Sequence, residues 1–255
     1  MSSISARGLA GIPEVRAGED LAALILAALA PDPPNAGQVV AIAHTVVSKA
    51  EGAIVALADV TPSERACALG LEQGRDPRAI QVVLDESAEV LREERGVLIC
   101  RTRHGFVCAN AGVDASNASP DGDAETLIVL PRDPDASARR IRARFRELTG
   151  LAAPAVLITD SFGRAWRHGQ VDVAIGLAGM QPLDDWRGRT DADGLELRAT
   201  WLAIADAAAA TADLARAKDS REPVVVLDGL ERFVTAEDGP GAATLLRPLA
   251  EDMFR

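Results

Sequence analysis

The stretch Val156–Gln170, VLITDSFGRAWRHGQ, decides how the rest of the chain is interpreted. Its first four residues are apolar or β-branched and predict a buried strand, with Asp160 and Ser161 directly at the strand end. A carboxylate beside a hydroxyl at such a place can hold a hard divalent cation through oxygen ligands. Arg164 and Arg167 follow as candidate anion contacts. The alternative is an ordinary polar turn that caps a strand, so a second polar segment is needed to choose between them.

A second polar segment, residues 110–117, reads NAGVDASN. It offers the carboxylate of Asp114, with amide and hydroxyl groups around it that include Asn117. Gly112 permits a tight turn, which would gather several oxygens around one point. Taken by itself the pattern is also typical of surface loops, because Asn, Asp, Ser and Gly dominate them.

A third polar group follows the apolar run 38–47, which predicts a buried strand. His44, Thr45 and Lys49 lie at or just beyond its end. Together with one or two divalent ions, a lysine can neutralise a nucleoside triphosphate and let its terminal phosphoryl group move. The alternative for Lys49 is a solvated side chain after a strand.

The remaining sequence predicts a mixed fold of short strands and helices. We expect helices at 20–29, 62–70, 77–95, 135–149 and 195–214, with Asp135 or Ser137 capping the fourth. We expect further strands at 97–100, 105–109, 127–131 and 223–227. The polar link RTRH between the first two predicts a hairpin and argues against an all-parallel sheet. Glycine-rich residues 171–180 lack the P-loop lysine pattern and favour close packing. The fold class is therefore α+β, a mixed α/β arrangement with mixed and antiparallel sheets.

Composition excludes several classes of partner. Across 255 residues, 38 acidic side chains outnumber 27 lysines and arginines, and the net charge of −11 opposes attraction to nucleic acid or anionic membranes. Three cysteines without zinc-type spacing suit a reducing compartment. No apolar run reaches the length of a membrane span, and the first residues lack a signal-peptide pattern. We expect a cytoplasmic protein.

Several stretches, in the same order along nearly the whole chain, resemble the coenzyme F-420-0:L-glutamate ligase family of gamma-glutamyl ligases. They are GIPEVRAGEDL at 11–21, VVSKAEG at 46–52, PSERA at 62–66, NAGVDASN at 110–117, LPRDPDASA at 130–138, ITDSFGRAWRHGQ at 158–170 and AIGLAG at 174–179. The resemblance implies a two-lobed α+β fold in which residues 1–255 form one catalytic unit, with a lobe boundary that the sequence does not set. It also implies a homodimer.

The resemblance further implies a GTP-dependent amide ligase that uses Mg²⁺ or Mn²⁺, with K⁺ as a candidate additional ion. GTP would phosphorylate a carboxylate of F-420-0, and the amine of L-glutamate would attack the acyl phosphate. Carried over by motif, the GTP contacts are Ile12, Pro13, Glu14, Val15, His44, Thr45, Lys49 and Asn117. The metal ligands are Asp114, Asp160 and Ser161, and no catalytic residue is assigned.

Three departures from the family pattern leave the acceptor open. His44 stands where a small hydroxyl residue is common, Ala207 follows Asp206 where an acidic pair is usual, and the segment 216–222 contains no glycine. The alternatives are a related GTP-dependent amide ligase with a different carboxylate acceptor, and a relative that binds nucleotide without turnover.

Overall fold

A five-stranded sheet forms the centre of the fold in the computed structural model, which describes residues 3–115, 126–217 and 219–252. The strand order is β1 (Ser5–Gly8), β12 (Val224–Asp228), β2 (Val39–Ala43), β8 (Ala155–Arg164) and β9 (Arg167–Ala178). Strands β2 and β8 run parallel, and the other three neighbouring pairs run antiparallel. The predicted α+β class, with mixed and antiparallel sheets, is confirmed.

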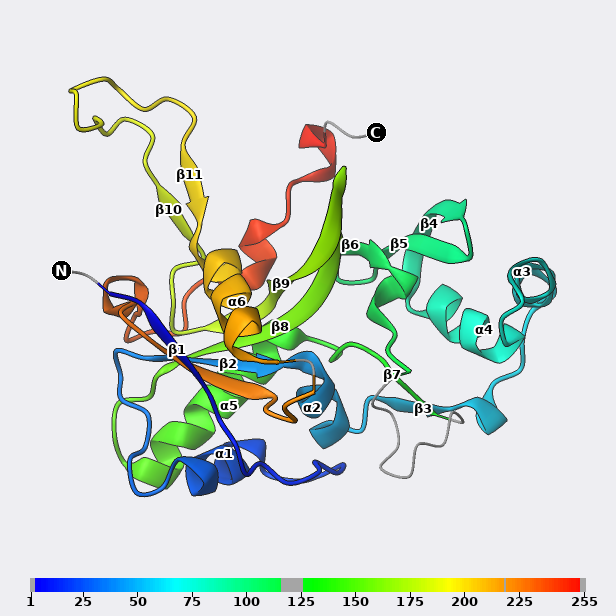
Figure 1. Ribbon diagram of the computed structural model, residues 1–255, viewed down its shortest axis with the longest axis horizontal. Helices are drawn as coiled ribbons and strands as arrows, with labels where there is room; N and C mark the ends of the chain where they lie inside the picture. The colour runs from blue at the N-terminus through cyan, green and yellow to red at the C-terminus, as the bar shows by residue number, and fades with distance from the viewer. Residues whose placement is uncertain (1–2, 116–125, 218, 253–255) are drawn as a thin grey trace.

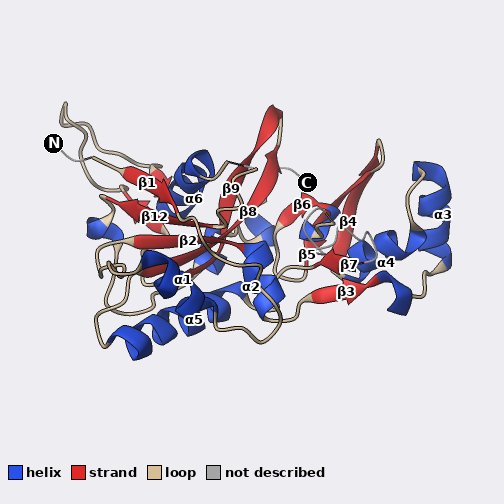
Figure 2. Ribbon diagram, turned by 60° about the horizontal axis from the view of Figure 1, so that its bottom comes forward, coloured by secondary structure: helices blue, strands red, loops and turns tan. Residues whose placement is uncertain are grey.

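Helices cover both faces of this sheet (Figures 1 and 2). Helices α1 (Leu21–Leu29) and α5 (Pro134–Thr149) pack on one face, and α6 (Ile204–Ala215) packs on the other. Successive strand residues point to opposite faces, so Val156 and Ile158 join the first core while Ala155 and Leu157 join the second. Burial on both sides explains why β2 and the first residues of β8 are apolar at successive positions rather than at every second one.

A second group of elements lies to one side of the central sheet (Figure 2). Its helices are α3 (Glu64–Gln73) and α4 (Pro77–Asp85), and its three-stranded sheet contains β4 (Ser87–Glu94), β5 (Val97–Thr102) and β6 (Val107–Ala109). Strands β3 (Ile54–Ala56) and β7 (Thr126–Ile128) pair antiparallel beside them. These elements bury apolar clusters of their own. The predicted hairpin formed by β5 and β6 is confirmed, whereas the division into two lobes stays a prediction.

Two predicted elements are wrong because strand pairing overrides helical periodicity. The predicted helix 77–95 ends at Asp85, and the following residues form β4 because they pair with β5. The predicted helix 195–214 begins only at Ile204, since Trp201–Ala203 forms β11 and pairs with β10 (Leu183–Asp185). The hairpin of β10 and β11 projects from the body of the molecule (Figure 1).

The predicted strand 38–47 is confirmed in its first half and wrong in its second half. Strand β2 stops at Ala43, and helix α2 (His44–Ala50) starts at once, so His44 and Thr45 begin a helix instead of ending a strand. The two β-branched valines in that helix supported the wrong prediction, but Val47 packs in the core from the helix.

Local packing explains further details of the sequence. The side chain of Asp133, rather than Asp135 or Ser137, caps α5 by accepting a hydrogen bond from the backbone N–H of Ala136. A side chain at Gly176 would collide with the carbonyl of Pro134, which confirms that this glycine serves close packing.

Short 3-10 helices complete the described elements: Leu57–Asp59, Asn110–Gly112, Glu231–Phe233, Ala242–Leu245 and Leu249–Glu251. Within the described ranges, every helix is too short or too polar to cross a lipid bilayer.

Candidate functional site

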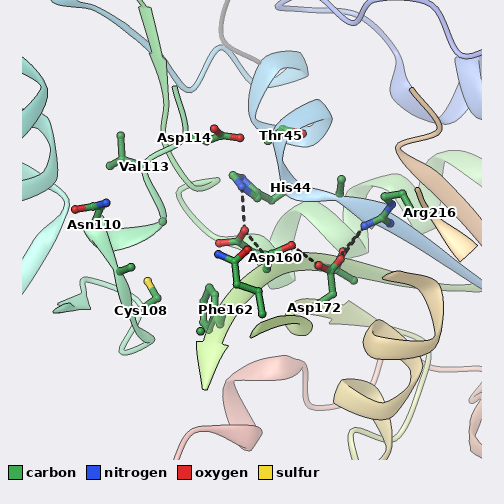
Figure 3. Close-up of a pocket in the computed structure, with 17 residues that line it drawn as sticks. His44, Thr45, Cys108, Asn110, Val113, Asp114, Asp160, Phe162, Asp172 and Arg216 are labelled. Carbon is green, nitrogen blue, oxygen red and sulfur yellow. Dashed lines mark hydrogen bonds and ion pairs between the residues drawn. The ribbon is translucent and has the colours of Figure 1, made fainter. Parts of the chain in front are cut away.

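A cavity of ≈ 410 Å³ opens between β8, β9, the start of α2 and the segment that follows β6 (Figure 3). Polar side chains from segments far apart in sequence line it. The lining residues are Ala43, His44, Thr45, Cys108, Ala109, Asn110, Gly112, Val113, Asp114, Thr159, Asp160, Ser161, Phe162, Gly163, Gln170, Asp172 and Arg216. The structure therefore brings Asp114, Asp160 and Ser161 to one cavity, together with His44 and Thr45.

One wall of the cavity is built from the antiparallel strands β8 and β9. Asp160 and Ser161 lie inside β8 rather than beyond its end, because the strand stays paired with β9 as far as Arg164. Asp172 stands directly opposite Ser161 in the register. Its Oδ1 accepts a hydrogen bond of 2.5 Å from the Ser161 hydroxyl, and its Oδ2 accepts one of 2.8 Å from the Thr159 hydroxyl.

Arg216, which directly follows α6, binds two residues of this wall. Its Nη1 donates to Asp172 Oδ2 at 2.8 Å and to the Thr159 hydroxyl at 3.1 Å. Burial lowers the pKa of the Arg216 guanidinium from its ordinary value, and the neighbouring Asp172 opposes that shift. Two further guanidinium nitrogens, Nε and Nη2, are buried without a hydrogen-bond partner in the part of the chain that the structure describes.

Sequence reasoning missed both Asp172 and Arg216. A signal for Asp172 was present, because an acid in the middle of the apolar run of β9 is expensive to bury without a partner. The turn between β8 and β9 does not predict this pairing, because the register shifts between Gly163 and Arg164 and moves Asp172 opposite Ser161. Arg216 gave no such signal, since its partners are more than forty residues away in sequence.

His44 contacts the metal-ligand candidate Asp160. Its Nε2 lies 3.4 Å from Asp160 Oδ1, and its Nδ1 lies 3.5 Å from the hydroxyl of Ser48. The His44 side chain is only 5% exposed, so this contact is part of the packed wall. In the view of Figure 3 the ring lies between the carboxylates of Asp114 and Asp160.

The opposite wall is a tight turn that precedes Asp114. Asn110 and Ala111 adopt left-handed backbone conformations with φ of 49° and 54°, and Gly112 follows with φ of 72°. The backbone of Asp114 then exchanges two hydrogen bonds with Ile128, which fixes its place at the cavity. Asn117, a predicted GTP contact, lies outside the described residues.

The cysteines differ in their surroundings. Burial raises the pKa of the Cys108 thiol to about 12, and the charge of Asp160 adds to the shift. Cys100 is also buried, and burial raises the pKa of its thiol as well. Cys100 and Cys108 are therefore buried thiols of low reactivity, whereas Cys67 is exposed.

The other predicted nucleotide contacts lie nearby on the same helix and on the N-terminal segment. The buried Lys49 ammonium of α2 forms an ion pair with Glu14, so the segment around Val15 is tied to the helix that carries His44 and Thr45. Lys49 and residues 12–15 are not among the described residues that line the cavity.

Comparison with known proteins identifies the family. The model of the F420-0:Gamma-glutamyl ligase family matches residues 10–229. The chain belongs to this family. A protein named coenzyme F420:L-glutamate ligase from Methanothermobacter thermautotrophicus is 42% identical, with 99% of each chain covered. Relatives with the same name from Methanopyrus kandleri and Halobacterium salinarum are each 44% identical, with 93–95% of each chain covered.

The two candidate anion contacts lie away from the cavity of this family member. Arg164 donates from Nη2 to the carbonyl of His168 at 2.6 Å and so closes the turn of the β8–β9 ribbon. Arg167 is exposed at the same tip. Neither is found among the lining residues within the described ranges, and their role as anion contacts stays a prediction.

Asp206, the acid that precedes Ala207 in α6, has a structural role. Asp206 accepts a hydrogen bond of 2.9 Å from the backbone N–H of Ala174, next to a register shift between β8 and β9. Burial raises the pKa of this carboxyl. An acid within this helix could be either solvated or directed at the site, but Asp206 is half-buried and binds a backbone N–H at a bulge of the sheet.

The donor set of the cavity fits magnesium or manganese. Carboxylate and hydroxyl oxygens of Asp114, Asp160 and Ser161 are the ligands that these ions prefer over sulfur. Among the residues that the structure describes, no group of three or more His, Cys, Asp and Glu side chains lies at metal-binding spacing. Such a site suits an ion that takes one or two protein carboxylates and completes its shell with water and phosphate oxygens.

Proposed function

We propose that the protein is a GTP- and divalent-metal-dependent ligase that adds L-glutamate to coenzyme F420-0. The observation that carries this proposal is the shared cavity of Asp114 and Asp160, which lie in segments far apart in sequence. Family membership supplies the substrates, because relatives that match nearly the full chain are named coenzyme F420:L-glutamate ligase.

The reaction needs an activated carboxylate, since a carboxylate is a poor electrophile until one of its oxygens becomes a leaving group. Transfer of the terminal phosphoryl group from GTP to a carboxylate of F420-0 gives an acyl phosphate and GDP. The amine of L-glutamate then attacks the acyl carbon, forms the amide bond and releases phosphate. A bound Mg²⁺ or Mn²⁺ supplies charge neutralisation for the phosphates.

The residues have distinct roles in this proposal. Asp114, Asp160 and Ser161 hold the divalent cation with their oxygens. Thr45 and His44 form the neighbouring nucleotide wall. The GTP contacts extend to Lys49 and residues 12–15, which the Glu14 ion pair holds together, and to Asn117. The oxygen ligands of Asp114, Asp160 and Ser161 are consistent with Mn²⁺ or Mg²⁺ as the bound ion. K⁺ is an additional candidate.

We also propose that the protein works as a homodimer. Support comes from the projecting β10–β11 segment, which exposes large apolar side chains of Leu195, Trp201 and Leu202. Large apolar side chains exposed on a projecting segment are typical of surfaces that another protein covers.

The test of the activity is a product analysis. Purified protein is incubated with F420-0, GTP, L-glutamate and MnCl₂, and the deazaflavin product is examined by mass spectrometry. The proposal predicts a product heavier by one glutamyl unit, formed with equal amounts of GDP and phosphate. Reactions without glutamate or without Mn²⁺ are the controls. Absence of the product with every nucleoside triphosphate would reject the proposal.

A second candidate keeps the chemistry and changes the acceptor. The observation that favours it is the contact of His44 with Asp160, because this position commonly holds a small hydroxyl residue in the family. GTP cleavage stimulated by another carboxylic acid, and not by F420-0, would establish this candidate. GTP binding without phosphate release under any acceptor would instead identify a nucleotide-binding protein without turnover.

A further inference from the structure

Asp172 connects Ser161 to Thr159 and Arg216 through hydrogen bonds in the β8–β9 wall, and Figure 3 shows its contact with Arg216. Asp172, only 2% exposed, accepts from Ser161 on one carboxylate oxygen and from Thr159 and Arg216 on the other. A carboxylate only accepts hydrogen bonds, and a serine hydroxyl has one proton. Since that proton is directed at Asp172, any partner of the same oxygen on the cavity side must be a hydrogen-bond donor or a cation.

We propose that Asp172 is a positioning residue that presents the Ser161 oxygen to the divalent cation, and that Arg216 fixes the orientation in which it does so. The inference rests on the proposed function, in which Ser161 is a metal ligand. Groups behind a metal ligand commonly set the direction in which its lone pairs point, and their loss weakens metal binding.

Arg216 determines which atom of residue 172 faces Ser161. Its Nη1 lies 2.8 Å from Asp172 Oδ2, on the side of the carboxylate away from Ser161. In an Asp172→Asn variant the side chain has one accepting oxygen and one donating NH₂ group. The positive guanidinium attracts the oxygen and repels the NH₂ group, so the NH₂ group must face Ser161. The serine then accepts instead of donating, and its own proton turns toward the cavity, where it opposes a cation.

The same reasoning predicts a rescue. With Met in place of Arg216, no charge holds the amide of the Asp172→Asn side chain in the unfavourable orientation. The amide oxygen can turn to Ser161, and the NH₂ group can donate to the Thr159 hydroxyl. The double variant Asp172→Asn/Arg216→Met therefore regains the original direction of the Ser161 hydrogen bond. It also removes both members of the buried ion pair together, which leaves no isolated buried charge.

The experiment measures Mn²⁺ binding without turnover, by electron paramagnetic resonance titration of the full chain, with and without GDP. Asp172→Asn is expected to weaken binding by about 10- to 100-fold. Ser161→Ala is expected to weaken it as well, and adding Asp172→Asn to Ser161→Ala should cause little further loss. The double variant Asp172→Asn/Arg216→Met should regain most of the affinity. Asp206→Asn is the matched control, because Asp206 contacts the neighbouring strand behind the wall and should leave binding unchanged.

The outcomes separate this inference from the proposed function. If the wild-type protein binds no Mn²⁺ with or without GDP, the metal-dependent function fails and the inference fails with it. If the wild-type protein binds Mn²⁺ and Asp172→Asn binds it equally well, only the inference is overturned. The same holds if Asp172→Asn loses affinity and the Arg216→Met change does not restore it, since a merely structural defect would persist in the double variant. Circular dichroism of each variant shows that the fold is kept.

Discussion

The two walls of the cavity hold their carboxylates by different means. In the β8–β9 wall, Asp160 and Ser161 lie inside paired strands, and a buried ion pair between Asp172 and Arg216 fixes the side chains behind them. In the opposite wall, Asp114 follows a turn with three successive positive φ angles. One wall is therefore organised through side chains, and the other through its backbone.

This difference shows which changes each wall tolerates. A wall fixed by charges and hydrogen bonds is sensitive to the chemistry of its side chains, because a buried polar group that loses its partner is costly. A wall fixed by backbone conformation is sensitive to steric change at its glycine. The predictions below test this contrast, beginning with the largest expected effect.

Loss of the Asp160 carboxylate has the largest expected effect. In Asp160→Asn the side chain keeps its size and loses the charge that holds the cation. Formation of the glutamylated product should fall by more than about 100-fold, because even groups behind a metal ligand contribute up to that factor. Glu147→Gln, at an exposed carboxylate of α5 paired with Arg144, is the control and should keep full activity. Unchanged activity of Asp160→Asn, measured by mass spectrometry, would contradict the role of this wall.

The backbone wall is tested at Gly112. A Cβ atom there would meet the side chain of Leu130 within about 3 Å, at a φ of 72° that side chains disfavour. Gly96 has a similar φ of 76° and open space around it. Gly112→Ala should lower the free energy of unfolding by about 2–3 kcal/mol and Gly96→Ala by about 1 kcal/mol. Urea unfolding measures both values, and equal losses would show that steric crowding at this turn is unimportant.

The labelling rates of two thiols compare the interior of the protein, at Cys108, with its surface, at Cys67. With a pKa of about 12, Cys108 carries almost no thiolate at pH 8, and the side chain is buried. Iodoacetamide at this pH should label the exposed Cys67 first, and should label Cys108 only after urea is added. Peptide mass spectrometry over time distinguishes the two. Equal labelling rates in the folded protein would mean that the cavity region opens readily.

The smallest effect concerns Asp206, behind the β8–β9 wall. Its folded pKa is raised above the ordinary value of 3.8 by burial, so the folded state holds its proton over a pH range in which the unfolded state does not. Relative to Asp206→Asn, the wild-type protein should therefore lose stability as the pH rises from 3.8 through the folded pKa, and the difference should then stay constant. Urea unfolding at several pH values measures the difference. An opposite slope would show that the Ala174 hydrogen bond dominates over burial.

The sequence predicts the central elements of the fold and part of the candidate site. The strands β8 and β12 and the buried face of α5 follow from the spacing and composition of their apolar residues. The two polar motifs that contain Asp114 and Asp160 line one cavity. The start of α2 could not be predicted, because valines favour a strand locally and only packing against the core makes this segment helical. Arg216 could not be assigned, since its contact with Asp172 depends on how α6 crosses the sheet.

The most direct test of the account is a crystal structure of the protein grown with MnCl₂ and GDP, with anomalous data collected at the manganese edge. The account predicts an anomalous peak in the cavity, at coordination distance from carboxylate oxygens of both Asp114 and Asp160, with the GDP phosphates on the same ion. Manganese bound elsewhere, with both carboxylates free of it, would contradict the claim that the two walls form one metal-nucleotide site.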